Sequence, residues 1–172
     1  MDAKDWSHGN ALRYNPDSNT YLLSMGYANI VLEVDRDSGE VVRYFGEGGD
    51  YSFADGTVPF DYQHSPHYTA EGTLLMTSNV DGSLHAIEYE VDDTNKVLTQ
   101  IWSHAQDEGI AALSMGHVQR MANGNTLMSF GSSALIREVT PDDEIVWEVK
   151  LANPAFAPFG DLTVFDSFYT AD

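Results

Sequence analysis

The sequence lacks cysteine altogether, which excludes disulfide bridges, thiolate catalysis and cysteine-ligated metal centres. Basic residues are scarce: eight lysines and arginines stand against 27 aspartates and glutamates, and the formal net charge is −19. A surface this acidic repels nucleic acid and anionic lipid, so neither is expected as a partner. No apolar run approaches the length of a transmembrane helix, so no membrane span is expected.

The amino-terminal segment lacks the basic and apolar regions of a signal peptide. Either the protein is cytoplasmic, or the start of a longer secreted precursor is missing. Its 172 residues, 42% of them hydrophobic, are typical of one folded domain. The acidic residues are dispersed along the chain, which indicates a solvated surface rather than a charged tail.

A unit of four short β-rich runs, separated by turns of Asn, Asp, Gly and Pro, occurs three times. Each unit begins at a histidine, and these histidines recur about every 55 residues. The turns are too short for crossover helices, so neighbouring strands are antiparallel. We therefore predict an all-β fold of β-propeller blades, in a single domain over residues 1–172. The expected blades span about 8–46, 63–104 and 116–151, with a closing strand at 160–169.

Three blades are too few for a closed ring, because propellers typically carry about four to eight. Alone, such a chain would leave open sheet edges that promote aggregation. Two explanations fit: the sequence is part of a longer propeller, or two copies close a ring as a homodimer. We favour an assembly that covers the edges.

The histidines that begin the three units are His8, His64 and His117. The first strand of each propeller blade lies along the central channel, so equivalent positions are expected to converge there. Such imidazoles could be structural, could hold a metal ion, or could act as nucleophile and acid/base on a small anionic group. No compact metal-ligand spacing is present, so we predict neither a metal site nor a cofactor. The other histidines, His67, His85 and His104, are expected to be structural or exposed.

The segment Asp5-Trp6-Ser7-His8-Gly9-Asn10 is similar to the Asp-Trp-x-His-x-Asn motif of bacterial arylsulfate sulfotransferases. Gln63-His64 resembles the Gln-His pair of the same family, with Phe60 and Asp61 just ahead of it. The segment 116–125 resembles a later blade of a related secreted branch. The resemblance covers nearly the whole chain and corresponds to the carboxyl-terminal half of a six-bladed propeller.

This resemblance implies a transferase that moves sulfate from an aryl sulfate to a phenol without a nucleotide donor. His64 would be the nucleophile that carries a transient sulfohistidine, and His8 would be the acid/base at the phenol oxygen. Asn10 would help to hold the sulfate oxygens, and His117 and Arg120 are further expected substrate-binding residues. The resemblance also implies a periplasmic or extracellular location.

The sequence departs from the family in two places. Where the family has an arginine after the serine of the second strand, this chain has Met25-Gly26-Tyr27. Arg120 could supply the missing charge, although an exposed or blade-packing role is the alternative for it. A histidine that the family takes from an earlier blade has no counterpart here. Two other hypotheses therefore stay open: a non-catalytic propeller used for binding or assembly, and a metal-dependent hydrolase.

Overall fold

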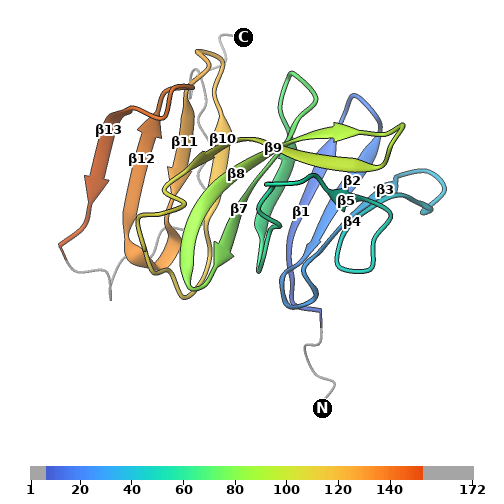
Figure 1. The fold of residues 1–172 in the computed structure, drawn as a ribbon, viewed down its shortest axis with the longest axis horizontal. Coiled ribbons are helices and arrows are strands. Elements are labelled where there is room, and N and C mark those ends of the chain that lie inside the picture. Colours follow the sequence, from blue (N-terminus) through green and yellow to red (C-terminus); the bar gives the residue numbers. More distant parts are fainter. Residues whose placement is uncertain (1–6, 153–172) are drawn as a thin grey trace, which may run out of the picture.

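The computed structural model describes residues 7–152, which form three twisted β-sheets standing side by side (Figure 1). Blade one has the order β1-β2-β3-β4, and blade three has the order β10-β11-β12-β13. Blade two has the order β5-β9-β8-β7-β6. Within residues 7–152 there is no α-helix, and no helix is long and apolar enough to span a membrane.

The strands of each blade follow one another along the chain. Blade one consists of β1 (Gly9–Asn15), β2 (Thr20–Met25), β3 (Ile30–Asp35) and β4 (Val41–Gly46). Blade two consists of β5 (Ser52–Phe53), β6 (His64–Tyr68), β7 (Leu74–Val80), β8 (Ser83–Asp92) and β9 (Val97–His104). Blade three consists of β10 (His117–Arg120), β11 (Thr126–Ser129), β12 (Leu135–Val139) and β13 (Ile145–Lys150).

The predicted all-β fold of four-stranded antiparallel blades is confirmed, and the sheets do not close into a ring. One strand was not expected: β5, from the segment between blades one and two, pairs in parallel with β9. Two residues are too few to show a strand periodicity in the sequence. The predicted closing strand at 160–169 lies outside the described residues.

Local turn chemistry explains the hairpins. The side-chain oxygen of Asp35 accepts hydrogen bonds from the backbone N–H groups of Asp37 and Ser38, which starts the β3–β4 turn. Asp92 does the same for Thr94 and Asn95 in the β8–β9 turn. These Asx-turns offer the backbone a defined reversal between two extended runs.

A second kind of turn recurs in blades one and three. The 3₁₀ helices Gly26–Ala28 and Gly131–Ser133 join the second and third strands of their blades. Each ends in a residue of left-handed conformation, Asn29 at φ 52° and Ala134 at φ 54°. The two turns therefore repeat one local structure, as expected of copies of one unit.

The hydrophobic core lies between the blades. One buried cluster joins blades one and two, and its fully buried side chains include Leu22, Phe45, Leu74, Ile87 and Tyr89. A second cluster joins blades two and three and includes Leu75, Leu84, Val118, Met128 and Phe130. Burial between sheets, at about 25 cal/mol per Å² of apolar surface, therefore holds the blades in their relative positions.

Buried glutamates connect successive blades. Glu33 on β3 is fully buried, and its carboxylate accepts a hydrogen bond of 2.9 Å from the hydroxyl of Tyr68 on the inner strand of blade two. Burial and the neighbouring Glu33 raise the pKa of Tyr68, so this hydroxyl keeps its proton. Glu88 on β8 in the same way accepts a hydrogen bond from Arg120 on the inner strand of blade three.

These two contacts are equivalent in the strand register. Glu33 and Glu88 lie opposite Leu22 and Leu75 on the second strands of their blades. We call each pair of glutamate and inner-strand donor an interblade latch. The latches add directional polar contacts beside the apolar clusters, so they help to fix how neighbouring blades align.

Candidate functional site

The three candidate histidines do not hold equivalent positions. His64 begins β6 opposite Thr77, and His117 begins β10 opposite Ser129. The matching position in blade one belongs to Ala11, opposite Ser24. A bulge in the pairing between Gly9 and Ala11 separates His8 from that row. His64 and His117 therefore hold equivalent strand positions, and the expectation that His8 shares this position was wrong.

His8 and His64 nevertheless line one cavity. It has a volume of about 170 Å³ and lies at the starting ends of the inner strands β1 and β6. No acidic side chain is among the described residues that line it, although the protein as a whole is strongly acidic. Its lining residues are His8, Asn10, Tyr62, His64, Asn79, Leu84, Ala112, Ser114 and Met115.

Two tyrosines flank His8. The imidazole lies 4.5 Å from the ring of Tyr27 and 5.7 Å from the ring of Tyr62, measured between ring centroids. The two tyrosine rings are 5.4 Å apart. Such a group of rings offers faces and edges against which another aromatic ring can pack. Neither tyrosine was predicted as a site residue, because the family motifs do not include them.

Gln63 positions the residue that follows it. Its side-chain amide donates hydrogen bonds to the hydroxyl of Ser24 and, at 2.7 Å, to the carbonyl of Ile30, both in blade one. Its own carbonyl accepts hydrogen bonds from Nδ2 of Asn10, at 2.8 Å, and from Ser24. Gln63 is fully buried, so these contacts hold the start of β6, and with it His64, against blade one.

Two asparagines present buried acceptors to the cavity. Nδ2 of Asn10 is bound to the carbonyl of Gln63, and Nδ2 of Asn79 donates to the carbonyl of Ala112 at 3.0 Å. These contacts fix the amide orientations. In both residues Oδ1 is buried and has no hydrogen-bond partner within residues 7–152. A buried acceptor left without a partner costs about 1–3 kcal/mol, so the two oxygens suit a ligand that donates hydrogen bonds.

Gly26 lies in the segment Met25-Gly26-Tyr27, where the family has an arginine after the serine of the second strand. A β-carbon at Gly26 would lie 2.7 Å from Nδ2 of Asn10 and 3.5 Å from the imidazole of His8. The backbone N–H of Gly26 also donates to the carbonyl of His8 at 3.0 Å. A side chain at position 26 would therefore displace Asn10 from its contact with Gln63.

The other two predicted binding residues lie outside this cavity. His117 is buried, and its Nδ1 lies 2.9 Å from the hydroxyl of Ser65. Arg120 pairs with Glu88, donates to Thr126 and stacks over the ring of Trp102 at 5.5 Å. Arg120 therefore packs between blades two and three, which was the alternative named for it. The predicted roles of His8, Asn10, His64, His117 and Arg120 in catalysis and binding stay predictions.

The remaining histidines are partly or fully buried within the blades. His85 is buried, and this burial lowers its pKa. His104 contacts a carboxylate oxygen of Asp143 at 2.6 Å through Nδ1. Within residues 7–152 no group of three or more His, Asp or Glu side chains is placed to hold a metal ion.

Similar solved structures share the fold at low sequence identity. A streptogramin B lyase is 14% identical with a TM-score of 0.56, covering 88% of this chain and 43% of its own. Virginiamycin B lyase from Staphylococcus aureus is 13% identical with a TM-score of 0.53, covering 89% and 44%. Hydrazine synthase from Kuenenia stuttgartiensis is 14% identical with a TM-score of 0.56, covering 89% and 40%. The chain thus spans less than half the length of these proteins.

The chain was also compared with curated proteins and with models of protein families. No curated protein matches it. The family model for arylsulfotransferase (ASST) matches residues 1–152, which include both histidine motifs. This match covers most of the sequence and agrees with the resemblance seen in the motifs around His8 and His64. The chain therefore belongs to the arylsulfotransferase family.

Proposed function

We propose that this protein transfers a sulfate group from an aryl sulfate to a phenol at the cavity shared by His8 and His64. The observation that carries this proposal is that two histidines from separate family motifs line one small cavity beside Tyr27 and Tyr62. Aromatic walls suit an aryl ring. The lining, which has no acidic side chain among the described residues, suits a sulfate ester better than the acidic surface does.

The reaction would proceed in two steps. In the first, an imidazole nitrogen of His64 attacks the sulfur, the bond from sulfur to the aryl oxygen breaks, and His8 protonates the departing phenolate. In the second, His8 takes the proton of the acceptor phenol as its oxygen attacks the sulfur. The nitrogen–sulfur bond then breaks and His64 returns to its starting form. No nucleotide or other cofactor enters either step.

The asparagines would orient the phenol. Oδ1 of Asn10 and Oδ1 of Asn79 are acceptors, so they suit the hydroxyl of an acceptor phenol rather than a sulfate oxygen. The second N–H of the Asn10 amide remains for the sulfate, which is the role that the family resemblance implies. His117 would contribute to substrate binding indirectly, through Ser65, whose hydroxyl lies 2.9 Å from Nδ1 of His117. We place the reaction in the periplasm or outside the cell, the usual location of this family.

A second function is favoured by one observation. The segment Met25-Gly26-Tyr27 lacks the arginine expected in this family, and Arg120 is held by Glu88. Without a cation at the sulfate, transition-state stabilisation of a few kcal/mol would be lost. The same cavity would then bind aryl compounds without turnover, as part of a binding or assembly module.

Release of 4-nitrophenolate from 4-nitrophenyl sulfate, with phenol as acceptor, tests the transfer. We expect turnover in the wild type, loss of at least about a hundredfold in His64→Ala, and a covalent SO₃ adduct on His64 by mass spectrometry when phenol is withheld. The control is His85→Gln, which changes a histidine that does not line the cavity. Binding of the ester without release of 4-nitrophenolate would favour the binding module. Equal turnover in wild type and His64→Ala would refute the assignment of His64.

A further inference from the structure

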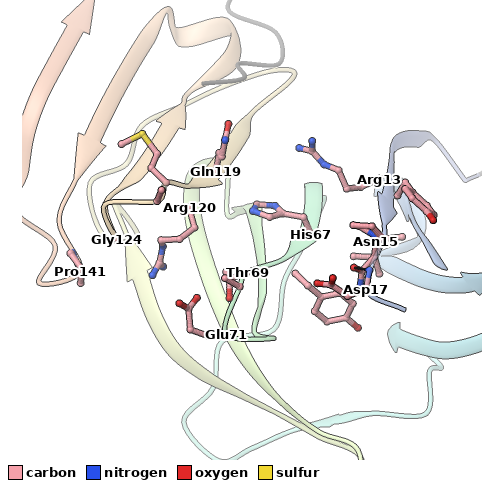
Figure 2. Close-up of a pocket in the computed structure, with 17 residues that line it drawn as sticks. Arg13, Asn15, Asp17, His67, Thr69, Glu71, Gln119, Arg120, Gly124 and Pro141 are labelled. Atoms are coloured by element: carbon pink, nitrogen blue, oxygen red, sulfur yellow. Dashed lines mark hydrogen bonds between the residues drawn. The ribbon is translucent and has the colours of Figure 1, made fainter. Parts of the chain in front are cut away.

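A second and larger cavity lies at the opposite ends of the inner strands. Its volume is about 720 Å³, within the range of small-molecule sites, and Figure 2 shows the side chains that line it. It receives residues from β1, β6 and β10 and from the turns that follow them. Its lining includes the apolar side chains of Leu22, Tyr68 and Met121. Neither His8 nor His64 reaches it.

Three polar side chains occupy equivalent places on the inner strands of this cavity. Arg13 lies opposite Leu22, His67 opposite Leu75, and Gln119 opposite Leu127. In Figure 2 these three side chains lie at a similar level along their strands, with the guanidinium of Arg13 directed into the space between blades one and three. One row of the repeat therefore supplies hydrogen-bonding groups from three blades to the same cavity.

Arg13 lacks the ion pairs that three other arginines of the described residues form. Arg43, Arg120 and Arg137 each form an ion pair with at least one carboxylate. Arg13 is half-buried, yet it forms no hydrogen bond or ion pair with any residue in 7–152. Arg36 also pairs with no carboxylate of residues 7–152, but it is exposed and contacts Asn19 and the ring of Tyr14. Of the described arginines, Arg13 is the half-buried one without a partner, and it lines the cavity. Its planar group of donors is suited to the two oxygens of a carboxylate or similar oxyanion.

His67 is buried near positively charged groups of the cavity. Burial is the main cause that lowers the pKa of His67 to about 4, and the nearby positive charges of Arg13 and Arg120 lower it further, as does His117. At neutral pH the imidazole is therefore uncharged, and its Nδ1–H donates to the carbonyl of Ser65 at 3.2 Å. An anion beside Arg13 would offset these positive charges.

Charged groups at the rim restrict where an anion can bind. Asp17 and Glu71 lie on exposed turns that also line the cavity. The charge of Arg120 is already neutralised by Glu88. Arg13 is therefore the cation that an anion can reach without displacing an existing ion pair. We propose that this cavity binds an organic anion, whose carboxylate, sulfate or phosphate group contacts Arg13 and whose apolar part packs against Leu22, Tyr68 and Met121.

Isothermal titration of the chain with benzoate tests this proposal, with benzamide as the uncharged analogue. We expect benzoate to bind the wild type, benzamide to bind at least about tenfold more weakly, and Arg13→Gln to weaken benzoate binding by a similar factor. The matched control is Arg36→Gln, which removes an exposed arginine from the same blade, outside the cavity. Equal benzoate affinity in Arg13→Gln and Arg36→Gln would overturn the proposal. Inorganic sulfate is a third probe. If the protein binds sulfate as tightly as benzoate, the cavity recognises the oxyanion alone, and the proposed role of the apolar part of the ligand is wrong. If sulfate binds more weakly than benzoate, the cavity recognises an organic anion.

The titration of His67, followed by NMR, is a second readout that does not depend on heat of binding. Benzoate should raise the pKa of His67 in the wild type, because a nearby negative charge favours the imidazolium. Arg13→Gln should raise it without any ligand and should abolish the response to benzoate. An unchanged His67 pKa on addition of saturating benzoate would contradict binding at this row. His64→Ala should leave these results intact, so failure of sulfate transfer and failure of this site are distinguishable.

Discussion

Gly26 controls the conformation of Asn10 because there is no space for a side chain between them. A β-carbon at position 26 would meet Nδ2 of Asn10 at 2.7 Å, and that nitrogen is already bonded to the carbonyl of Gln63. The amide would have to break this hydrogen bond to move away. The ring of Tyr27, the next residue, lies beside His8.

We expect Gly26→Ala to destabilise the fold by about 1 kcal/mol and to reduce sulfate transfer by about tenfold, because Asn10 leaves the cavity. The measurements are a denaturant titration and the 4-nitrophenyl sulfate assay. Gly9→Ala is the control at the same site, since a β-carbon there has no neighbour within 4 Å. If Gly26→Ala and Gly9→Ala show the same stability and the same transfer activity, then the contact with Asn10 does not explain the effect of a side chain at position 26.

The residues of the candidate site could be predicted from the sequence to different degrees. His8, Asn10 and His64 stand in short motifs whose residue types have chemical roles, so they were found. Tyr27 and Tyr62 were missed because their contact with His8 depends on the 3₁₀ turn at 26–28 and on the backbone at Tyr62, where φ is 44°. Periodicity carries no signal for such positions.

Arg13 was missed for a different reason. An arginine on a strand usually lies at a solvated surface, and the sequence does not say whether a carboxylate will neutralise it. Arg120 was named as a possible binding residue because it stands on an inner strand, with an exposed or blade-packing role as the alternative. The structure separates the two residues, since Glu88 of the neighbouring blade reaches Arg120 and no carboxylate in 7–152 pairs with Arg13.

At the level of the elements, Gln63 joins the inner strand of blade two to the second and third strands of blade one. The buried side-chain amide of Gln63 donates hydrogen bonds to both Ser24 and Ile30. A carboxylate in its place would face the carbonyl of Ile30 and the Ser24 hydroxyl with an acceptor instead of a donor. The contact with the Ile30 carbonyl would therefore become repulsive unless the buried acid is protonated. The Ser24 hydroxyl could donate to the carboxylate only by giving up its hydrogen bond to the carbonyl of residue 63.

We expect Gln63→Glu to lower the free energy of unfolding by about 2–3 kcal/mol at neutral pH, measured by denaturant titration. Part of this loss should return as the pH falls, because a protonated carboxyl regains a donor. Gln106→Glu is the matched control, since the oxygen of Gln106 accepts from Gln100 and a carboxylate keeps that role. A loss of similar size in both variants would show that the added charge, rather than the interblade contact, is responsible.

The order and type of the strands could be predicted because each unit repeats four runs with turn residues between them. Asp35 and Asp92 begin turns that the sequence identifies directly. β5 could not be predicted, since its pairing with β9 depends on how the segment between two blades packs. The bulge before Ala11 was also invisible, and it moved His8 out of the row that His64 and His117 share.

At the scale of the whole molecule, both ends of the blade series carry half of an interblade latch. Tyr14 lies opposite Tyr21, the place on blade one that Tyr68 and Arg120 hold on the next two blades. Tyr14 is 43% exposed. Glu138 lies opposite Leu127, the place on blade three that corresponds to Glu33 and Glu88. A further blade at either end would therefore meet a donor or an acceptor at the latch position, in competition with the present contacts to Asn19 and Asn125.

Two copies of the chain can supply these partners to each other, with Tyr14 of each meeting Glu138 of the other around a two-fold axis. We expect light scattering after size-exclusion chromatography to give twice the 19.0 kDa mass of the chain. Tyr14→Glu should yield monomers, because two carboxylates would then face each other across both contacts. Adding Glu138→Arg should restore the dimer by turning each contact into the ion pair of Arg120 and Glu88 with the charges exchanged. A dimer that persists in Tyr14→Glu would be formed by another surface. A monomeric wild type would mean that the blades which cover Tyr14 and Glu138 come from a different chain segment or partner.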